Sequence, residues 1–169
     1  GMKMEGDMEE LLEIDDVIND ITDVIEKKGR VDIVYTGVYY SEAGYVETIK
    51  VSNDEKTLYE KNLKNVIAGD FNFTNDIQDK LLEYYLDELE DNAVHYFEEY
   101  FKEEVNDYSL WWGDDALYVI IDTENNKYKV VVATWSKKNY YSHQVEHLRL
   151  IFDFEAEDFE ECELDEWDV

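Results

Sequence analysis

Apolar residues recur at spacings of three and four positions in two parts of the chain, and this period predicts two amphipathic helices. We expect the first helix over residues 8–28, with Gly29 as its C-terminal cap. We expect the second helix over residues 75–105, with Asn75 in a capping box at its start. Because a helix of this length is uncommon in globular proteins, a break around residues 90–92 remains an alternative.

Other parts of the chain alternate between apolar and polar residues, which is the pattern of strands with one buried face. Two such runs over residues 31–52 flank a short turn at residues 41–44 and predict a β-hairpin. Residues 53–73 are polar and irregular, with a short strand or a helical turn near residues 58–67 as alternatives. Further strands are predicted over residues 116–122, 127–135 and 147–154. This order of elements predicts an α+β fold, in which an antiparallel sheet of hairpins packs against the two amphipathic helices.

The length of 169 residues favours a single domain, which we place at residues 8–154. We interpret residues 1–7 as a tag scar and an N-terminal leader. Residues 155–169 are expected to form an acidic tail, because the chain from Asp153 onwards has ten acids and no base. No secretory signal or membrane span is expected, and a single cysteine, Cys162, precludes an internal disulfide. These features favour a cytoplasmic location.

The charge of the chain limits its partners more strongly than any motif does. Asp and Glu number 44 against 15 Lys and Arg, which gives a net charge of −29. A surface this acidic disfavours direct binding to nucleic acids and to anionic membranes, since both need basic protein surfaces. A basic protein is the partner that the charge permits, and the binding could resemble that of a DNA mimic or an immunity protein. The alternative is that the acids serve solubility alone.

The chain lacks the sequence motifs of the common enzyme classes that we considered, so we expect no catalytic residue, no cofactor and no metal ion. The strongest exception is the pair His143 and His147, which on a helix would form part of a divalent-metal site. The pair lies at the start of a predicted strand, where residues four apart are about 13 Å from each other. This separation disfavours a metal site, so a metal-dependent hydrolase that uses carboxylates with His143 and His147 is only the alternative function. The helical tyrosines Tyr84, Tyr85, Tyr96 and Tyr100 are expected in the core.

Two adjacent tryptophans, Trp111 and Trp112, are the most distinctive local feature of the chain. On a strand they would point to opposite faces, so that one could anchor the core and the other a partner. The alternative is that both fill gaps between the long helix and the sheet. The candidate partner contacts are Trp111, Trp112, Trp167, Asp158, Glu160 and Glu161.

A further set of residues forms a pattern along the chain: Val34–Gly37, Ser41, Gly44, Val46–Ile49, Trp111–Gly113 and the predicted hairpin over residues 115–135. Over about residues 30–150, this arrangement resembles an uncharacterised bacterial family of small acidic α+β proteins, in which a long helix and a terminal hairpin follow the opening hairpin. The chain has Glu42-Ala43 where the family more often has a Gly-Asp-Ser turn. The family has no assigned activity, so the resemblance implies a bacterial protein of this fold class and assigns no site residue.

Overall fold

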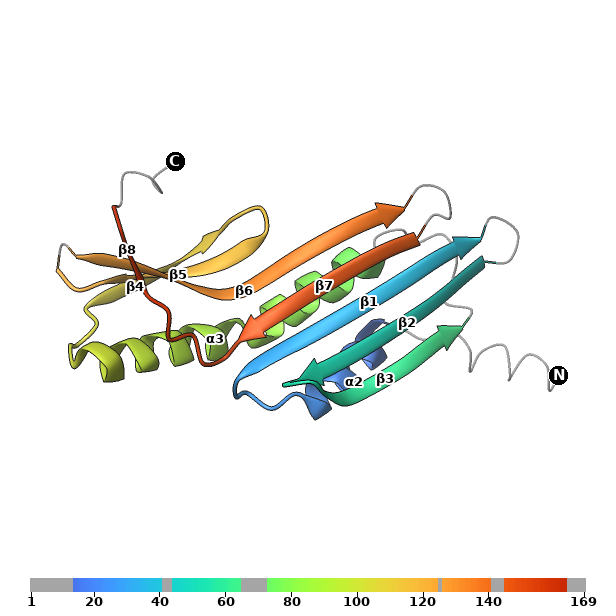
Figure 1. Ribbon diagram of the computed structural model, residues 1–169, viewed down its shortest axis with the longest axis horizontal. Coiled ribbons are helices and arrows are strands. Elements are labelled where there is room, and N and C mark those ends of the chain that lie inside the picture. Colours follow the sequence, from blue (N-terminus) through green and yellow to red (C-terminus); the bar gives the residue numbers. More distant parts are fainter. Residues whose placement is uncertain (1–13, 41–43, 65–72, 125, 141–144, 164–169) are drawn as a thin grey trace. The chain divides into compact units, whose positions relative to one another are not determined.

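The computed structural model describes residues 14–40, 44–64, 73–124, 126–140 and 145–163. These residues form two helices and eight strands (Figure 1). The elements are α2 (Ile14–Val24), β1 (Arg30–Tyr40), β2 (Gly44–Asn53), β3 (Lys56–Lys64), α3 (Phe73–Phe101), β4 (Asp107–Trp112), β5 (Ala116–Asp122), β6 (Lys127–Tyr140), β7 (Val145–Asp153) and β8 (Glu160–Cys162). The strands join in the order β3-β2-β1-β7-β6-β5-β4, and β8 pairs with β6 outside this order. The predicted α+β class with an antiparallel sheet is confirmed.

The chain divides into two compact units. Unit 1 consists of Gly1–Glu26, Asp32–Tyr84 and Ser136–Leu150. Unit 2 consists of Lys27–Val31, Tyr85–Trp135 and Ile151–Val169. Because β1, α3, β6 and β7 contribute residues to both units, neither unit is a continuous stretch of sequence. The single domain over residues 8–154 stays a prediction.

In unit 1, α2 buries Val17, Ile18 and Ile21 and directs Asp20 towards β3. The hydroxyl of Tyr59 on β3 donates a hydrogen bond to Asp20 Oδ2 at 3.2 Å. Burial and the negative charge of Asp20 together raise the pKa of Tyr59 to about 12. This contact joins the helix to the sheet within unit 1.

The C-terminal end of the first helix differs from the prediction. The helix ends at Val24, and the residues from 25 to 29 form a coil and a bend before β1. Gly29 has a φ of 68°, a value that glycine adopts without strain. It is not the helix cap that we expected; its carbonyl instead accepts a hydrogen bond from the Phe154 N–H at 2.8 Å within unit 2.

The turn between β2 and β3 consists of Asp54 and Glu55, which both have positive φ values of 47° and 68°. Asn53 pairs with Lys56 on either side of it, so the connection is a two-residue hairpin turn. The structure therefore has a strand where the sequence left a strand and a helical turn as alternatives. The turn between β1 and β2, at residues 41–43, lies outside the described residues.

An ion pair links β1 to β7 within unit 1. Arg149 Nε donates to Asp32 Oδ1 at 3.0 Å, and Arg149 Nη2 donates to Asp32 Oδ2 at 2.6 Å. The planar guanidinium thus binds the carboxylate through two parallel hydrogen bonds, the stronger geometry for such a pair. These bonds and the charge of Asp32 raise the pKa of Arg149 further.

The long helix α3 begins two residues before Asn75 and continues without the break that we considered at residues 90–92. It ends at Phe101, four residues earlier than predicted. Lys102 follows with a φ of 53°, the left-handed conformation that commonly terminates helices. Residues 102–106, which have no regular secondary structure, then connect the helix to β4.

Every fourth residue of α3 from Ile77 to Phe97 is buried, as the sequence pattern predicts. The buried residues are Ile77, Leu81, Tyr85, Leu89, Ala93 and Phe97. Since an α-helix has 3.6 residues per turn, a repeat of four advances by about 40° at each step, and the buried stripe winds around the helix. Tyr84 and Tyr100 lie away from this stripe and are exposed, contrary to our expectation that they belong to the core.

In unit 2, β5 pairs with β4 on one side and with β6 on the other. The β5 side chains of Leu117, Val119 and Ile121 are fully buried. The strand β8 pairs with the start of β6, where Lys129 is opposite Glu160. It lies among the residues that we predicted as an acidic tail, so part of that segment joins the sheet.

Four aromatic side chains form what we call the aromatic cluster: Phe97, Phe101, Tyr128 and Phe159. The ring of Phe97 lies 4.5 Å from Phe101, 5.1 Å from Tyr128 and 5.2 Å from Phe159, measured between ring centroids. Its plane is nearly perpendicular to that of Phe159, at 88°, which is a favourable edge-to-face geometry. The cluster joins α3 to β6 and to the segment before β8.

We expect Phe97→Ala to destabilise the protein by about 3–5 kcal/mol, because the substitution leaves a cavity among packed rings. Tyr100→Ala is the matched control, since Tyr100 lies three residues further along α3 and is 69% exposed. It should cost about 1 kcal/mol or less. Urea unfolding curves of both variants measure the difference, and equal losses would contradict a central role for Phe97.

Candidate functional site

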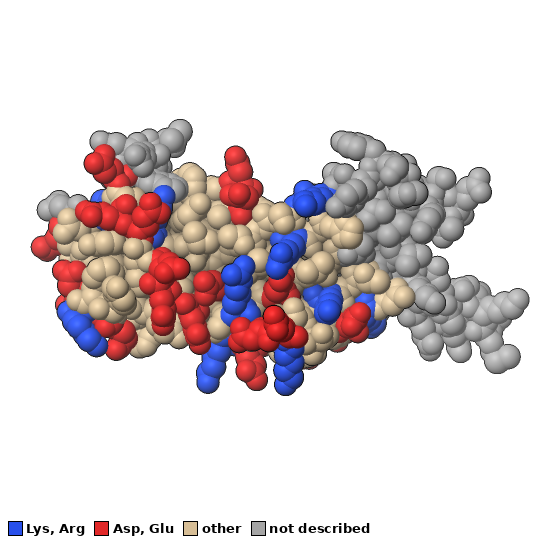
Figure 2. Space-filling model, viewed as in Figure 1, with Lys and Arg blue, Asp and Glu red and all other residues tan. Residues whose placement is uncertain are grey.

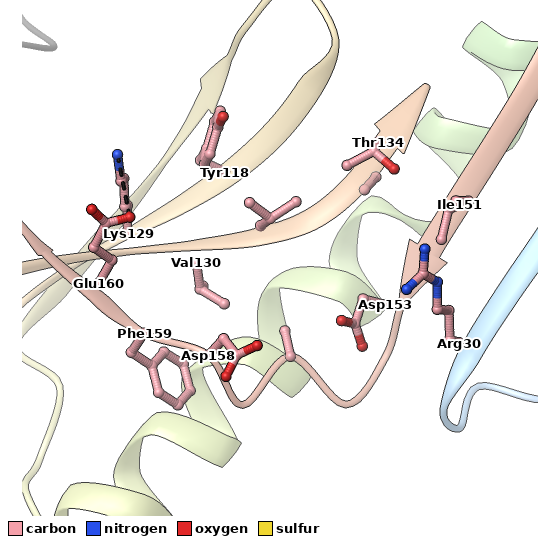
Figure 3. A pocket seen from close by; sticks show the side chains of 13 residues that line it. Arg30, Tyr118, Lys129, Val130, Thr134, Ile151, Asp153, Asp158, Phe159 and Glu160 are labelled. Atoms are coloured by element: carbon pink, nitrogen blue, oxygen red, sulfur yellow. Dashed lines mark ion pairs between the residues drawn. The ribbon is translucent and has the colours of Figure 1, made fainter. Parts of the chain in front are cut away.

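Unit 2 contains a pocket of about 460 Å³ (Figure 3). Its walls come from β6, the end of β7, the segment 154–159 and the first residue of β8, together with Arg30 at the start of β1 and Tyr118 of β5. Its apolar lining includes Val130, Ile151, Ala156 and Phe159, and its charged lining consists of Arg30, Lys129, Asp153, Asp158 and Glu160. Figure 3 shows Arg30 beside Asp153 at one end and Lys129 beside Glu160 at the other. The pocket therefore offers an apolar surface between two charged ends.

A β-bulge in β6 shapes this pocket. Leu117 pairs with Ala133, whereas the next residue of β5, Tyr118, pairs with Val131. Val132 is therefore the extra residue, and both Val132 and Ala133 are buried. A bulge bends its strand and re-aims the side chains on either side of it. Here it interrupts the alternation after Val131, so that the consecutive residues Val132 and Ala133 are both buried, while Val131 is exposed and lines the pocket.

Asp153 is the half-buried acid of the pocket. It ends β7, and its Oδ1 accepts a hydrogen bond from the Glu155 N–H at 3.1 Å. Burial raises the pKa of the Asp153 carboxyl above its usual range, and the negative charges of Asp158 and Glu155 act in the same direction. The Glu155 N–H and the positive charge of Arg30 oppose the rise without cancelling it.

The other end of the pocket carries an ion pair between two strands. Lys129 Nζ lies 3.7 Å from Glu160 Oε2, and the two residues are cross-strand neighbours in β6 and β8. The Glu160 side chain is mostly exposed, so solvent weakens this pair. The charged lining therefore comprises three acids and two bases.

The structure brings together part of the predicted contact set. Asp158 and Glu160 both line the pocket, on either side of Phe159. Glu161 lies next to them in β8, opposite Tyr128 of β6, and is exposed. Trp167 lies outside the described residues.

The two adjacent tryptophans lie on β4 and point to opposite faces, as alternation along a strand requires. Trp111 is half-buried and packs on Tyr118, with ring centroids 5.4 Å apart. Trp112 is 52% exposed and lies 6.3 Å from the ring of Trp135. One tryptophan therefore lies on each face of β4, and a role of either one in partner contact stays a prediction.

The two histidines that the structure describes lie on different elements and in different units. His95 is exposed on α3, with its ring 5.6 Å from that of Tyr96. His147 is half-buried on β7, and His143 lies outside the described residues. Among residues 14–40, 44–64, 73–124, 126–140 and 145–163, no group of three His, Cys, Asp or Glu side chains is placed to hold a metal ion. The metal-dependent hydrolase stays an untested alternative.

Sequence reasoning missed Asp153 and Arg30 as parts of one site. The alternation of residues 147–154 indicated that Asp153 is on the polar side of its strand, but it did not indicate partial burial. Arg30 reaches the same place because β1 and β7 are neighbours in the sheet. No local pattern carries that information, since it depends on strand pairing between distant segments.

Acids predominate on the surface of unit 2 that Figure 2 shows. Two side chains on α3, Tyr96 and Glu90, have pKa values that are raised mainly by burial and in smaller part by nearby acids. Burial raises the pKa of the Tyr96 hydroxyl, and the charges of Glu155, Glu157 and Asp153 raise it further. Burial also raises the pKa of Glu90, with smaller contributions from acids that flank it on the same helix.

Comparisons with known proteins place the chain in no family: no family model, curated protein or solved structure matches it. The resemblance to a bacterial family of small acidic proteins therefore stays a prediction. Neither helix of the described residues combines the length and the apolar character that a membrane span needs.

We expect the stability of the native protein relative to the Asp153→Asn variant to fall as the pH rises from acid to neutral. The raised pKa of Asp153 means that the unfolded chain releases this proton at a lower pH than the folded chain does. Folding is therefore penalised above the carboxyl range, whereas Asn cannot ionise. Urea unfolding of both proteins at several pH values measures the effect, and a difference that is constant or grows the other way would contradict it.

Proposed function

We propose that this protein is a non-catalytic interaction module that binds a basic protein through the acidic surface of unit 2. The observation that carries the proposal is the arrangement of Asp153, Asp158 and Glu160 around one pocket with an apolar lining. An inhibitor of a basic protein, acting in the manner of a DNA mimic or an immunity protein, would have a surface of this kind.

The pocket has the chemistry to hold a lysine or arginine side chain of the partner. The aliphatic stem of such a side chain would lie along Val130, Ala156 and Phe159. Its cationic head would meet Asp158, whose carboxylate is exposed at the pocket. Burying an aliphatic stem while keeping the charged head paired is a common way to anchor a basic side chain.

The charge of the whole chain supports the same partner at longer range. A net charge of −29 attracts a basic protein before contact and raises the rate of association at low salt. The Debye length of about 10 Å at 0.1 M salt limits this attraction. Binding should therefore weaken as the salt concentration rises.

Binding of a fluorescein-labelled hexa-arginine peptide, followed by anisotropy across a salt series, tests the proposal. The double variant Asp158→Asn, Glu160→Gln should weaken binding by about tenfold, because it removes two acids of the pocket. The double variant Asp87→Asn, Asp91→Asn changes the net charge equally at exposed positions on α3 and should weaken binding by about twofold or less.

Two results would contradict the proposal. The first is no binding of the peptide at any salt concentration. The second is an equal loss in the two double variants, which would show that the bulk charge acts without the pocket.

A further inference from the structure

We propose that the outer edge of β4 binds an extended basic segment of the partner as an additional strand of the sheet. This inference rests on the proposed function, because it specifies how the same basic partner is held. It is carried by a different part of unit 2 from the pocket, namely the strand Asp107–Trp112.

The strand β4 is at one end of the strand order, and β5 is its one neighbour among the described strands. Gly113 N–H donates to the Ala116 carbonyl at 2.8 Å, which sets the phase of the hydrogen bonds between β4 and β5. Because bonded and non-bonded pairs alternate in an antiparallel ladder, Ser109 and Trp111 face β5 with their backbone groups. The backbone N–H and C=O groups of Leu110 and Trp112 then point to the outer edge.

A hydrogen bond at the start of the strand agrees with this phase. By the same alternation, the N–H of Tyr108 points to the outer edge. It donates a hydrogen bond to Asp107 Oδ1 at 2.9 Å. The side chain of Asp107 thus occupies the first outward donor. An added strand would bond to the next two, on Leu110 and Trp112.

The three residues whose backbone groups point to the outer edge also have their side chains on one face of the strand. Tyr108, Leu110 and Trp112 alternate along the strand and therefore lie on one face. Tyr108 is 42% exposed and Trp112 is 52% exposed, while Leu110 between them is half-buried. This row offers an apolar surface to alternate side chains of an added strand, the arrangement that strand addition uses for specificity.

The two end strands of the sheet differ in composition. The strand β3 carries Lys56, Lys61 and Lys64, and lysines on edge strands discourage further pairing. The strand β4 contains neither lysine nor proline. The usual protection of an edge strand is therefore present on β3 and missing on β4.

The acids around β4 indicate which kind of segment would bind at its outer edge. Acids flank β4 at both ends, and residues 103–115 contain no Lys or Arg. The flanking acids are Glu103, Glu104, Asp107, Asp114 and Asp115, and all are exposed. A second copy of this chain would bring the same acids to the edge, and like charges repel. A segment with lysine or arginine between apolar residues is attracted instead.

The probe for this inference is a short fluorescein-labelled peptide of alternating valine and lysine. We expect Leu110→Pro to weaken its binding by about tenfold or more, because proline removes an outward N–H that the bonds to β5 do not use. Leu110→Ala is the matched control: it also loses the leucine side chain but keeps the N–H, and its loss should be clearly smaller.

Two measurements on the native protein do not depend on the folding of any variant. N-methylation of alternate amides in the peptide should abolish binding, since it removes the donors of an added strand while keeping the charge. Bound peptide should also slow the hydrogen exchange of the Leu110 and Trp112 amides.

The outcomes separate this inference from the proposed function. Salt-sensitive binding that is unaffected by Leu110→Pro and by N-methylation would overturn the β4 site and leave the proposed function standing. Failure of every basic peptide to bind would overturn both. A dimer in sedimentation experiments that Leu110→Pro dissociates would identify a second copy as the occupant and overturn the inference.

Discussion

The candidate site depends on the contact between the rings of Phe97 and Phe159. Phe97 is fully buried on α3, and Phe159 belongs to a segment that has no regular secondary structure before β8. Asp158 and Glu160 are the neighbours of Phe159 in the chain. The contact of Phe159 with Phe97 therefore also fixes both acids at the pocket. Acids this close in sequence repel one another. The burial of aromatic surface offsets that repulsion and gives the acids defined positions.

The few bases of unit 2 stabilise local structure. Lys27 pairs with Glu88 on α3, Lys127 lies 3.4 Å from Asp122 across β5 and β6, and Lys129 pairs with Glu160. Because these cations neutralise acids within their own unit, the remaining excess of acids faces solvent. The charge of the protein therefore acts outwards as a field, which is the property that the proposed binding of a basic partner requires.

The sequence predicts those features that a short periodic pattern determines. The repeat of four that ends at Phe97 and the opposite directions of Trp111 and Trp112 follow from helix and strand geometry. Local signals predict less well where charge obscures the pattern, as in β3, which is rich in lysine and lies at an edge of the sheet. The pocket could not be predicted, because Arg30 and Asp153 meet through the pairing of β1 with β7.

The lack of a side chain at Gly113 leaves room for the ring of Trp111, which packs on Tyr118 in the wall of the pocket. A Cβ atom on Gly113 would lie 2.9 Å from Trp111 Cζ3, which is closer than ordinary van der Waals contact, and 3.3 Å from the Ala116 carbonyl oxygen, which is tight. Tyr118 lines the pocket, and Trp111 packs on it. A side chain at Gly113 would therefore displace the ring of Trp111, and through it disturb Tyr118 in the pocket wall. Any family of homologues that retains this pocket wall should therefore accept no bulkier residue at this position.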